Sequence, residues 1–257
     1  MPRFAANISF LWTELPFLDR FAAAAKAGFR GVEFHYPYDT PTYDVKAQLD
    51  ANGLTPVLIN IRAGDAAAGE SGLACLPGRE ADFRAAVSEC IDYLQAIDAD
   101  RANCLAGKIP EGTPREECEA VLAANLKYAG QQFAKAGKRL MVEPLNSKDV
   151  PRFLLTTSAA TIAVLDRVGL DNVMLQYDFY HMHIMEGDLT ANVRRLLSRI
   201  GHIQFADTPG RHEPGSGEID YRHLFAHLEN IGYAGWASAE YRPRTTTEES
   251  LGWFLGA

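Results

Sequence analysis

The sequence lacks the features of a membrane-bound, secreted or zinc-finger protein. No apolar run approaches the roughly 18 residues that span a bilayer. The N-terminus, MPRFAANISFLW, lacks the long apolar segment and cleavage site of a signal peptide. The four cysteines form no CxxC pair, and no histidine lies at zinc-finger spacing from them. We therefore expect a cytoplasmic protein with reduced thiols and no membrane partner.

Positive charge is also scarce. Lysine and arginine number 25 against 33 aspartates and glutamates, which gives a net charge of −8 and a pI of about 5.4. A protein that follows a nucleic-acid backbone usually has the opposite balance, so we expect no nucleic-acid partner. The chain is 47% hydrophobic and 23% charged, which is typical of a globular protein with a large core.

Strand and helix patterns alternate from one end of the sequence to the other. Strands are predicted at 4–12, 31–36, 55–61, 101–107, 139–146, 173–182, 201–207 and 235–241. Helices are predicted at 16–27, 42–51, 79–97, 113–136, 157–168 and 221–230, and two more begin at 188 and near 247. Thr113, followed by Pro114, and Asp188 are expected to cap two of them. Eight units without a linker predict an α/β fold, a single (β/α)8 TIM barrel over residues 1–257.

Four predicted strands in the C-terminal half end near a residue that can bind a divalent metal. They are Glu143 in LMVEPLN, Asp178 in VMLQYDFYH, Gln204 in GHIQFAD and Glu240 in GWASAEY. A carboxylate beside apolar strand residues is costly unless its charge is compensated. In a TIM barrel the C-terminal strand ends meet at the mouth. Three carboxylates and one amide oxygen gathered there indicate a Mg²⁺ or Mn²⁺ site.

Two of these four residues also suit acid/base catalysis. Glu143 and Glu240 come from the fifth and eighth predicted strands, so they are expected to face each other across a substrate. One can take a proton from a carbon while the other returns it, and a metal would stabilise the charge of an ene-diolate. This arrangement is typical of enzymes that move a carbonyl along a hydroxy-carbonyl chain or invert the neighbouring centre.

Three further residues are candidates for binding the substrate. His181, in DFYH, can orient a substrate oxygen or polarise a carbonyl. Arg211 lies in a Gly/Pro-rich, flexible loop and can clamp a carboxylate through two hydrogen bonds. Lys108 is a further cation for an anionic group. A solvated or structural position is the alternative for each of the three, and His183 is interpreted as structural.

Several longer stretches are more specific than these single residues. They are ANISFLW, VEFHYPYD, GDAAAGESGLACLPGRE, NCLAGK, VEPLN, QYDFYHMHIMEGD and HIQFADTPGRHEPGSGEIDY. On these stretches, which together span almost the whole chain, the sequence resembles the hydroxypyruvate isomerase family within the xylose isomerase-like barrels.

The resemblance implies a TIM barrel whose metal ligands are Glu143, Asp178, Gln204 and Glu240, with Glu143 and Glu240 as the catalytic pair. It implies interconversion of hydroxypyruvate and 2-hydroxy-3-oxopropanoate (tartronate semialdehyde), in which a proton leaves C3 and another is delivered to C2. The implied substrate is thus a small 2-oxo acid or sugar acid. The family also leaves a homo-oligomer open.

The resemblance keeps several alternatives open. Close relatives isomerise 2-oxo-tetronates, and more distant ones epimerise ketohexoses at C3. Gln204 stands where the ketose 3-epimerases tend to have histidine, which favours the hydroxypyruvate type. Arg62 stands where a proline is expected, and its effect on substrate length is undecided. A metal-dependent nuclease, disfavoured by charge, and a sugar-acid binding protein are other hypotheses. The choices between Mg²⁺ and Mn²⁺ and between proton and hydride transfer also stay open.

Overall fold

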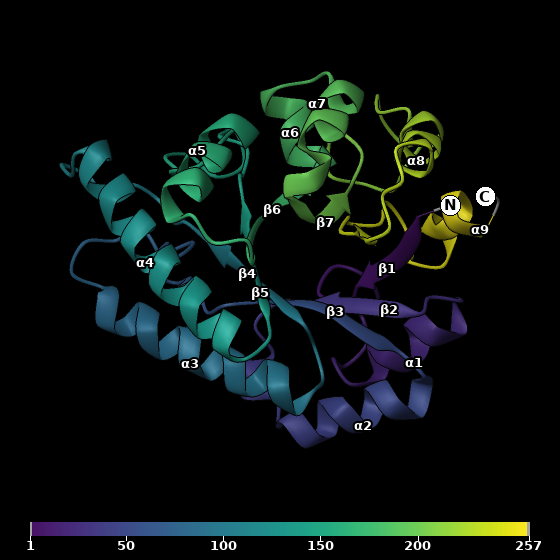
Figure 1. Ribbon diagram of the computed structural model, residues 1–257. Helices are drawn as coiled ribbons and strands as arrows, with labels where there is room; N and C mark the ends of the chain where they lie inside the picture. The colour runs from purple at the N-terminus through teal and green to yellow at the C-terminus, as the bar shows by residue number, and fades with distance from the viewer. Residues whose placement is uncertain (1, 256–257) are drawn as a thin grey trace.

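Parallel strands close into a barrel in which each strand pairs with the next in sequence and the last pairs with the first (Figure 1). The computed structural model describes residues 2–255, so residues 1, 256 and 257 of the expected domain lie outside the described residues. The described strands are β1 (Arg3–Asn7), β2 (Gly31–Phe34), β3 (Thr55–Asn60), β4 (Arg101–Leu105), β5 (Arg139–Glu143), β6 (Val173–Asp178), β7 (Ile200–Phe205) and β8 (Trp236–Ala239). The predicted eight-stranded (β/α)8 barrel is confirmed.

Helices surround the strands and cover the outside of the barrel (Figure 1). Within residues 2–255 they are α1 (Asp19–Lys26), α2 (Thr42–Asn52), α3 (Glu80–Ala96), α4 (Arg115–Lys135), α5 (Ser158–Val168), α6 (Phe179–Met185), α7 (Leu189–Leu196), α8 (Tyr221–Asn230) and α9 (Gly252–Leu255). Short 3-10 turns lie at Pro37–Asp39, Leu197–Arg199 and Glu249–Leu251. No helix in this part of the chain has the length and apolar character needed to cross a bilayer.

All eight strands end earlier than the sequence pattern predicted, β1 and β6 by the most. β1 stops at Asn7, whose carbonyl accepts the N–H groups of Phe10 and Leu11 in a turn. β6 stops at Asp178, because its carboxylate accepts the backbone N–H of Tyr180 at 2.9 Å and caps α6. The prediction that residues 179–182 continue the strand is therefore wrong, and His181 lies on a short helix.

Several helix starts and caps also differ from the predicted ones, and α1 begins at Asp19 rather than at residue 16. Pro114 is in an extended conformation, with ψ at 138°, so α4 begins at Arg115 and Thr113 is not its cap. Asp188 precedes α7 in a left-handed conformation, and its side chain accepts none of the helix N–H groups. The last helical segment begins at Glu249 rather than near 247.

The barrel has one apolar cluster outside the strands and another inside them. The larger cluster lies between the strands and the helices and contains all four cysteines, which are free, as predicted. The smaller one joins side chains from strands on different sides of the closed barrel, so their contacts cross the interior. Its buried members are Ala5, Val57, Leu58, Met141 and Trp236.

A buried polar layer lies above this interior cluster, toward the C-terminal strand ends. Side chains on one face of a strand recur every two residues. Two positions beyond Ala5, Leu58, Met141 and Trp236 stand Asn7, Asn60, Glu143 and Ser238, all of them buried. The alternation thus places an apolar plug in the lower barrel and polar side chains at its mouth, where active sites of this fold lie.

Candidate active site

The four predicted metal ligands all lie at the C-terminal end of the barrel. Glu143 and Asp178 are the last residues of β5 and β6, Gln204 is the next-to-last of β7, and Glu240 directly follows β8. Asp178 and Gln204 are partners in the register of β6 and β7. All four side chains are buried, at 4% exposure or less. Buried carboxylates need compensating partners, and this structure shows which groups supply them.

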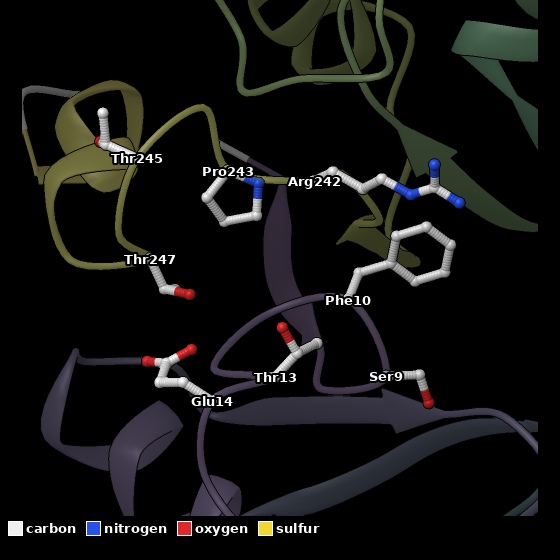
Figure 2. A pocket seen from close by; sticks show the side chains of 8 residues that line it. All are labelled: Ser9, Phe10, Thr13, Glu14, Arg242, Pro243, Thr245 and Thr247. Carbon is white, nitrogen blue, oxygen red and sulfur yellow. The ribbon is translucent and has the colours of Figure 1, made fainter.

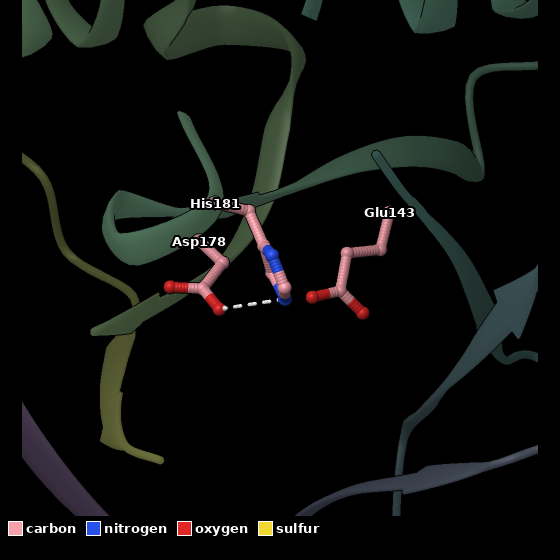
Figure 3. A group of neighbouring side chains, drawn as sticks. All are labelled: Glu143, Asp178 and His181. Carbon is pink, nitrogen blue, oxygen red and sulfur yellow. Dashed lines mark ion pairs between the residues drawn. The ribbon is translucent and has the colours of Figure 1, made fainter. Parts of the chain in front are cut away.

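Glu143, Asp178 and His181 form a group that could hold a metal ion (Figure 3). One ligand atom from each lies within 4.8 Å of the other two, and all three residues are buried. His181 enters this group because α6 turns directly after Asp178 and brings the ring back over the strand end. The histidine predicted to contact the substrate is therefore beside the carboxylates.

Hydrogen bonds fix which nitrogen of His181 carries the proton. Its Nδ1 accepts the backbone N–H of Asn146 at 3.1 Å, so Nδ1 is unprotonated and Nε2 bears the hydrogen. Burial and the nearby Arg211 lower the pKa of His181 to about 3, which keeps the ring neutral. Nε2 lies 3.5 Å from Asp178 Oδ2. In this tautomer His181 is a hydrogen-bond donor at the site, and it could bind a metal through Nε2 only after losing that proton.

Arg211 joins the two outer carboxylates of the site. Its Nη2 lies 2.7 Å from Glu240 Oε2 and 3.3 Å from Asp178 Oδ2. The guanidinium also lies between two aromatic rings, 5.0 Å from the centroid of Phe10 and 5.1 Å from that of Tyr180. Although burial opposes it, the pull of Glu240 and Asp178 raises the pKa of Arg211, which stays charged. The predicted substrate-binding arginine thus contacts two of the predicted metal ligands.

The loop that carries Arg211 is held by Asp207, contrary to the expectation of a flexible loop. The buried Asp207 carboxylate accepts the backbone N–H groups of Thr208, Gly215, Gly217 and Ile219 at 2.9–3.0 Å. A Cβ at Gly217 would lie 2.1 Å from the carbonyl oxygen of Thr208, so only glycine allows this approach. Arg211 is therefore presented by a closed, internally bonded loop.

The two glutamates of the proposed catalytic pair have different partners. Glu240 Oε1 lies 2.7 Å from His35 Nε2, and its other oxygen faces Arg211. Although burial favours the neutral acid, Arg211 and His35 lower the pKa of Glu240 to about 2. Among residues 2–255, Glu143 has only the amide of Asn103, at 2.7 Å, as a hydrogen-bond donor. Burial and the neighbouring Glu240 and Asp178 raise the pKa of Glu143 well above its usual range. Glu240 is thus held ionised, while Glu143 holds its proton more tightly than an ordinary glutamic acid.

The remaining predicted residues lie away from this cluster. Lys108 donates to the carbonyl of Gly69 at 3.0 Å, and the structure gives it no contact with the carboxylates. Arg62 pairs with Glu89 of α3 at 2.7 Å and lies over the ring of Tyr38, so it faces the helix layer. His183, interpreted as structural, lies 3.0 Å from a carboxylate oxygen of Glu218, which belongs to the 208–219 loop.

Three polar neighbours of the catalytic pair were not predicted from the sequence. His35 and Asn7 contact Glu240, and Asn103 contacts Glu143. A signal was present for His35, because GVEFHY alternates and places His35 on the same strand face as Glu33. Asn103 occupies the equivalent inward position on β4, in RANCL.

A small cavity adjoins the site on the side of β1 and β8 (Figure 2). It has a volume of about 370 Å³ and is lined by Ser9, Phe10, Thr13, Glu14, Arg242, Pro243, Thr245 and Thr247. Arg242 points toward the ring of Phe10, with its guanidinium 5.8 Å from the ring centroid. Because Arg211 packs against the same ring, the cavity and the carboxylate cluster are neighbours.

The chemistry of these groups fits a divalent cation. Glu143, Asp178 and Glu240 are buried carboxylates, and Arg211 pairs with the last two, so the fully ionised cluster has an excess of negative charge. Burial raises the pKa of Asp178 to about 7, Arg211 offsets this only in part, and the neighbouring Glu240 adds to it. Carboxylate and amide oxygens are ligands of hard cations. The residues present can therefore hold such an ion.

Comparison with known proteins agrees with this fold. The family model of the xylose isomerase-like TIM barrel matches residues 21–256. A 2-oxo-tetronate isomerase of Cupriavidus necator is 47% identical over 253 residues, which cover 98% of this chain and 97% of that protein. A hydroxypyruvate isomerase of Escherichia coli is also 47% identical, covering 98% of each. A crystal structure described as AP endonuclease, family 2, from Brucella melitensis superposes with a TM-score of 0.97 at 42% identity, over 100% of this chain and 99% of that one.

The closed barrel with acidic residues at its C-terminal end defines a xylose isomerase-like TIM barrel. Within that class, the chain belongs to the isomerase family that contains the hydroxypyruvate isomerases and 2-oxo-tetronate isomerases, as the sequence resemblance predicted.

Proposed function

We propose that the protein is a metal-dependent isomerase that interconverts hydroxypyruvate and 2-hydroxy-3-oxopropanoate. The observation that carries this proposal is the convergence of Glu143, Glu240, His181 and Arg211 at one end of the barrel. Together they supply two acid/base groups, a neutral hydrogen-bond donor and a cation for an acidic substrate. Relatives at 47% identity carry the names of this activity and of its four-carbon counterpart.

The proposed reaction moves two protons and leaves the formula of the substrate unchanged. One glutamate of the Glu143/Glu240 pair takes a proton from C3, and the electron pair forms the C2–C3 double bond of an ene-diolate. The other glutamate delivers a proton to C2. The hydroxyl proton on O3 leaves as the C3 aldehyde forms, and O2 gains a proton as it becomes a hydroxyl. The Nε2–H of His181 faces the site and can donate a hydrogen bond to O2.

We propose Glu143, Asp178, Gln204 and Glu240 as the ligands of a Mg²⁺ or Mn²⁺ ion. The ion would supply electrostatic stabilisation of the negative charge that develops on the substrate oxygens. Three carboxylates and an amide favour these metals over softer ones. Arg211 then holds the substrate carboxylate through its planar guanidinium. Lys108 remains a candidate for substrates with a second anionic group, because its ammonium has no carboxylate partner among the described residues.

Incubation with hydroxypyruvate in D₂O, followed by proton NMR, tests the proposal. The protein should produce the aldehyde of 2-hydroxy-3-oxopropanoate, with deuterium entering at C2 from solvent. The activity should disappear in EDTA and return with Mg²⁺ or Mn²⁺. E143Q and E240Q should each be inactive, whereas E218Q, an exposed glutamate of the same rim, should not differ from the parent. Turnover that persists in EDTA, or proton transfer without any solvent exchange, would contradict this mechanism.

A 2-oxo-tetronate is the second candidate substrate, and the cavity beside Phe10 favours it. The cavity of about 370 Å³ borders Arg211 through this ring and has hydroxyl groups in its lining, which suit an additional hydroxymethyl group. Comparing kcat/KM for the three-carbon and four-carbon acids decides between the two substrates. Turnover of a neutral ketohexose, with neither acid converted, would instead identify a ketose 3-epimerase.

We also propose that residues 1–257 act as one catalytic domain in the cytoplasm, as a monomer or a homo-oligomer. The site draws on residues from β1 to β8, so its parts cannot be divided between two units of the chain. Four free, buried cysteines are compatible with a reducing compartment.

A further inference from the structure

We propose that Glu33 is a positioning residue that turns the oxygen of the Gln204 carboxamide toward the metal site. This inference rests on the proposed function, in which Gln204 is a metal ligand. An amide can bind a cation only through its oxygen, and the two ends of a glutamine side chain have nearly the same shape. Something in the structure must therefore select one of the two orientations.

Glu33 is completely buried in the barrel, and hydrogen-bond donors surround its carboxylate. Its Oε1 accepts from Gln204 Nε2 at 2.6 Å and from Asn7 Nδ2 at 2.9 Å. Its Oε2 lies 2.7 Å from His202 Nε2. A buried carboxylate accepts hydrogen bonds and repels oxygen atoms. The reversed amide would place the oxygen of Gln204 against Oε1, so Glu33 holds the nitrogen end and sends the oxygen end away.

No other partner of Gln204 in the described structure selects its orientation. Its Oε1 accepts from Gln176 Nε2 at 2.6 Å, but Gln176 is itself a carboxamide whose oxygen has no hydrogen-bond partner within residues 2–255. The two amides could turn over together and keep the bond between them. Only the carboxylate of Glu33 distinguishes the two arrangements. Because a carbonyl oxygen has two lone pairs, Gln176 leaves one of them free for a cation.

Asn7 shows that this role is specific to Gln204. The Asn7 amide also donates to Glu33, and to Glu240 Oε1 at 3.2 Å. Its orientation is fixed independently, however, because Asn7 Oδ1 accepts the backbone N–H of Ser9 at 3.0 Å. Loss of the Glu33 carboxylate should therefore disturb the ligand on β7 and leave the amide beside Glu240 in place.

The test measures Mn²⁺ binding by calorimetry on the full chain, with Co²⁺ absorption spectra as a second readout. An amide at position 33 can present either end and no longer selects the orientation of Gln204. E33Q should therefore bind Mn²⁺ about 10- to 100-fold more weakly, as is typical for the loss of a partner that orients a metal ligand. The Co²⁺ spectrum should change as well. E89Q, the same substitution on the outer helix α3, should match the parent in both.

A second change provides a rescue that a purely structural role would not allow. In E33Q/Q204E the side chain at position 204 offers oxygen at both ends, so its orientation no longer matters, and Mn²⁺ affinity should return toward that of the parent. If E33Q does not fold, E33D serves instead, because it keeps the charge but withdraws it from Gln204, and it should weaken binding in the same direction.

Each outcome separates this inference from the proposed function. If the parent protein binds no Mn²⁺, the metal-dependent function itself fails. If the parent binds Mn²⁺ but E33Q or E33D binds it equally well with an unchanged Co²⁺ spectrum, only the role of Glu33 is overturned. Failure of E33Q/Q204E to recover affinity would also overturn it, because the loss would then not arise from the orientation of Gln204.

Discussion

Replacing Asp178 with asparagine should stabilise the metal-free protein while removing its response to metal. Burial raises the pKa of Asp178 from its ordinary value of 3.8 to about 7, and the ion pair with Arg211 only partly opposes this. A shift of this size corresponds to roughly 4 kcal/mol of unfavourable free energy for the ionised carboxylate. Asparagine keeps the side-chain oxygen that accepts the Tyr180 N–H and caps α6 about equally well. D178N thus removes the charge and keeps the cap.

The pH dependence of this gain has a definite sign. The folded protein holds the Asp178 proton more tightly than the unfolded chain, so the parent loses stability as pH rises from about 4 to about 7. D178N lacks this loss, and its advantage should therefore grow over the same range and level off above it. For a protein of this size, the free energy corresponds to a rise in Tm on the order of 10 °C.

Thermal unfolding in EDTA, followed by circular dichroism at several pH values, measures this difference. Addition of Mn²⁺ should then raise the Tm of the parent by mass action and leave that of D178N nearly unchanged. With Mn²⁺ the parent should therefore have the higher Tm of the two proteins. If D178N in EDTA is no more stable than the parent at pH 8, the ionised Asp178 carboxylate does not carry the cost assigned to it. If Mn²⁺ stabilises both proteins equally, Asp178 is not a metal ligand.

Other substitutions test the roles assigned to single side chains. R211K keeps a charge but loses the planar fork between Phe10 and Tyr180, so KM for hydroxypyruvate should rise by roughly tenfold or more in steady-state assays. H181N removes the Nε2–H donor and should lower kcat by about 10²-fold, with Mn²⁺ affinity from calorimetry nearly unchanged. N103A removes the only hydrogen-bond donor to Glu143 in the described part of the chain and should slow solvent deuterium incorporation more than it changes KM.

The architecture could be predicted from the sequence because its signal repeats along the whole chain. Eight apolar strand patterns, each followed by a helical pattern, allow few folds other than the barrel that is observed. Boundaries were less predictable where a side chain rather than the pattern decides them. The apolar residues after Asp178 extend the strand pattern, yet its carboxylate begins a helix at Phe179.

The candidate site could be located by the same alternation, but its internal contacts could not. Glu143, Asp178 and Glu240 stand at strand ends, and their positions follow from the fold. The contacts of Arg211 depend on how the 208–219 loop folds back around Asp207, which no periodic pattern encodes. The bond between Glu33 and Gln204 joins residues 171 positions apart across the barrel interior, so it appears only once the barrel has closed.

The loop around Asp207 bears on how this protein recognises what it binds. Four backbone bonds to one carboxylate mean that Arg211 stands in place before any ligand arrives. Binding of an acidic ligand should then cost little conformational entropy of the loop. The association rate should not be limited by a loop movement. New specificities could evolve through substitution of side chains at the rim of the barrel. Arg211 would keep its position and continue to bind the carboxylate of the ligand.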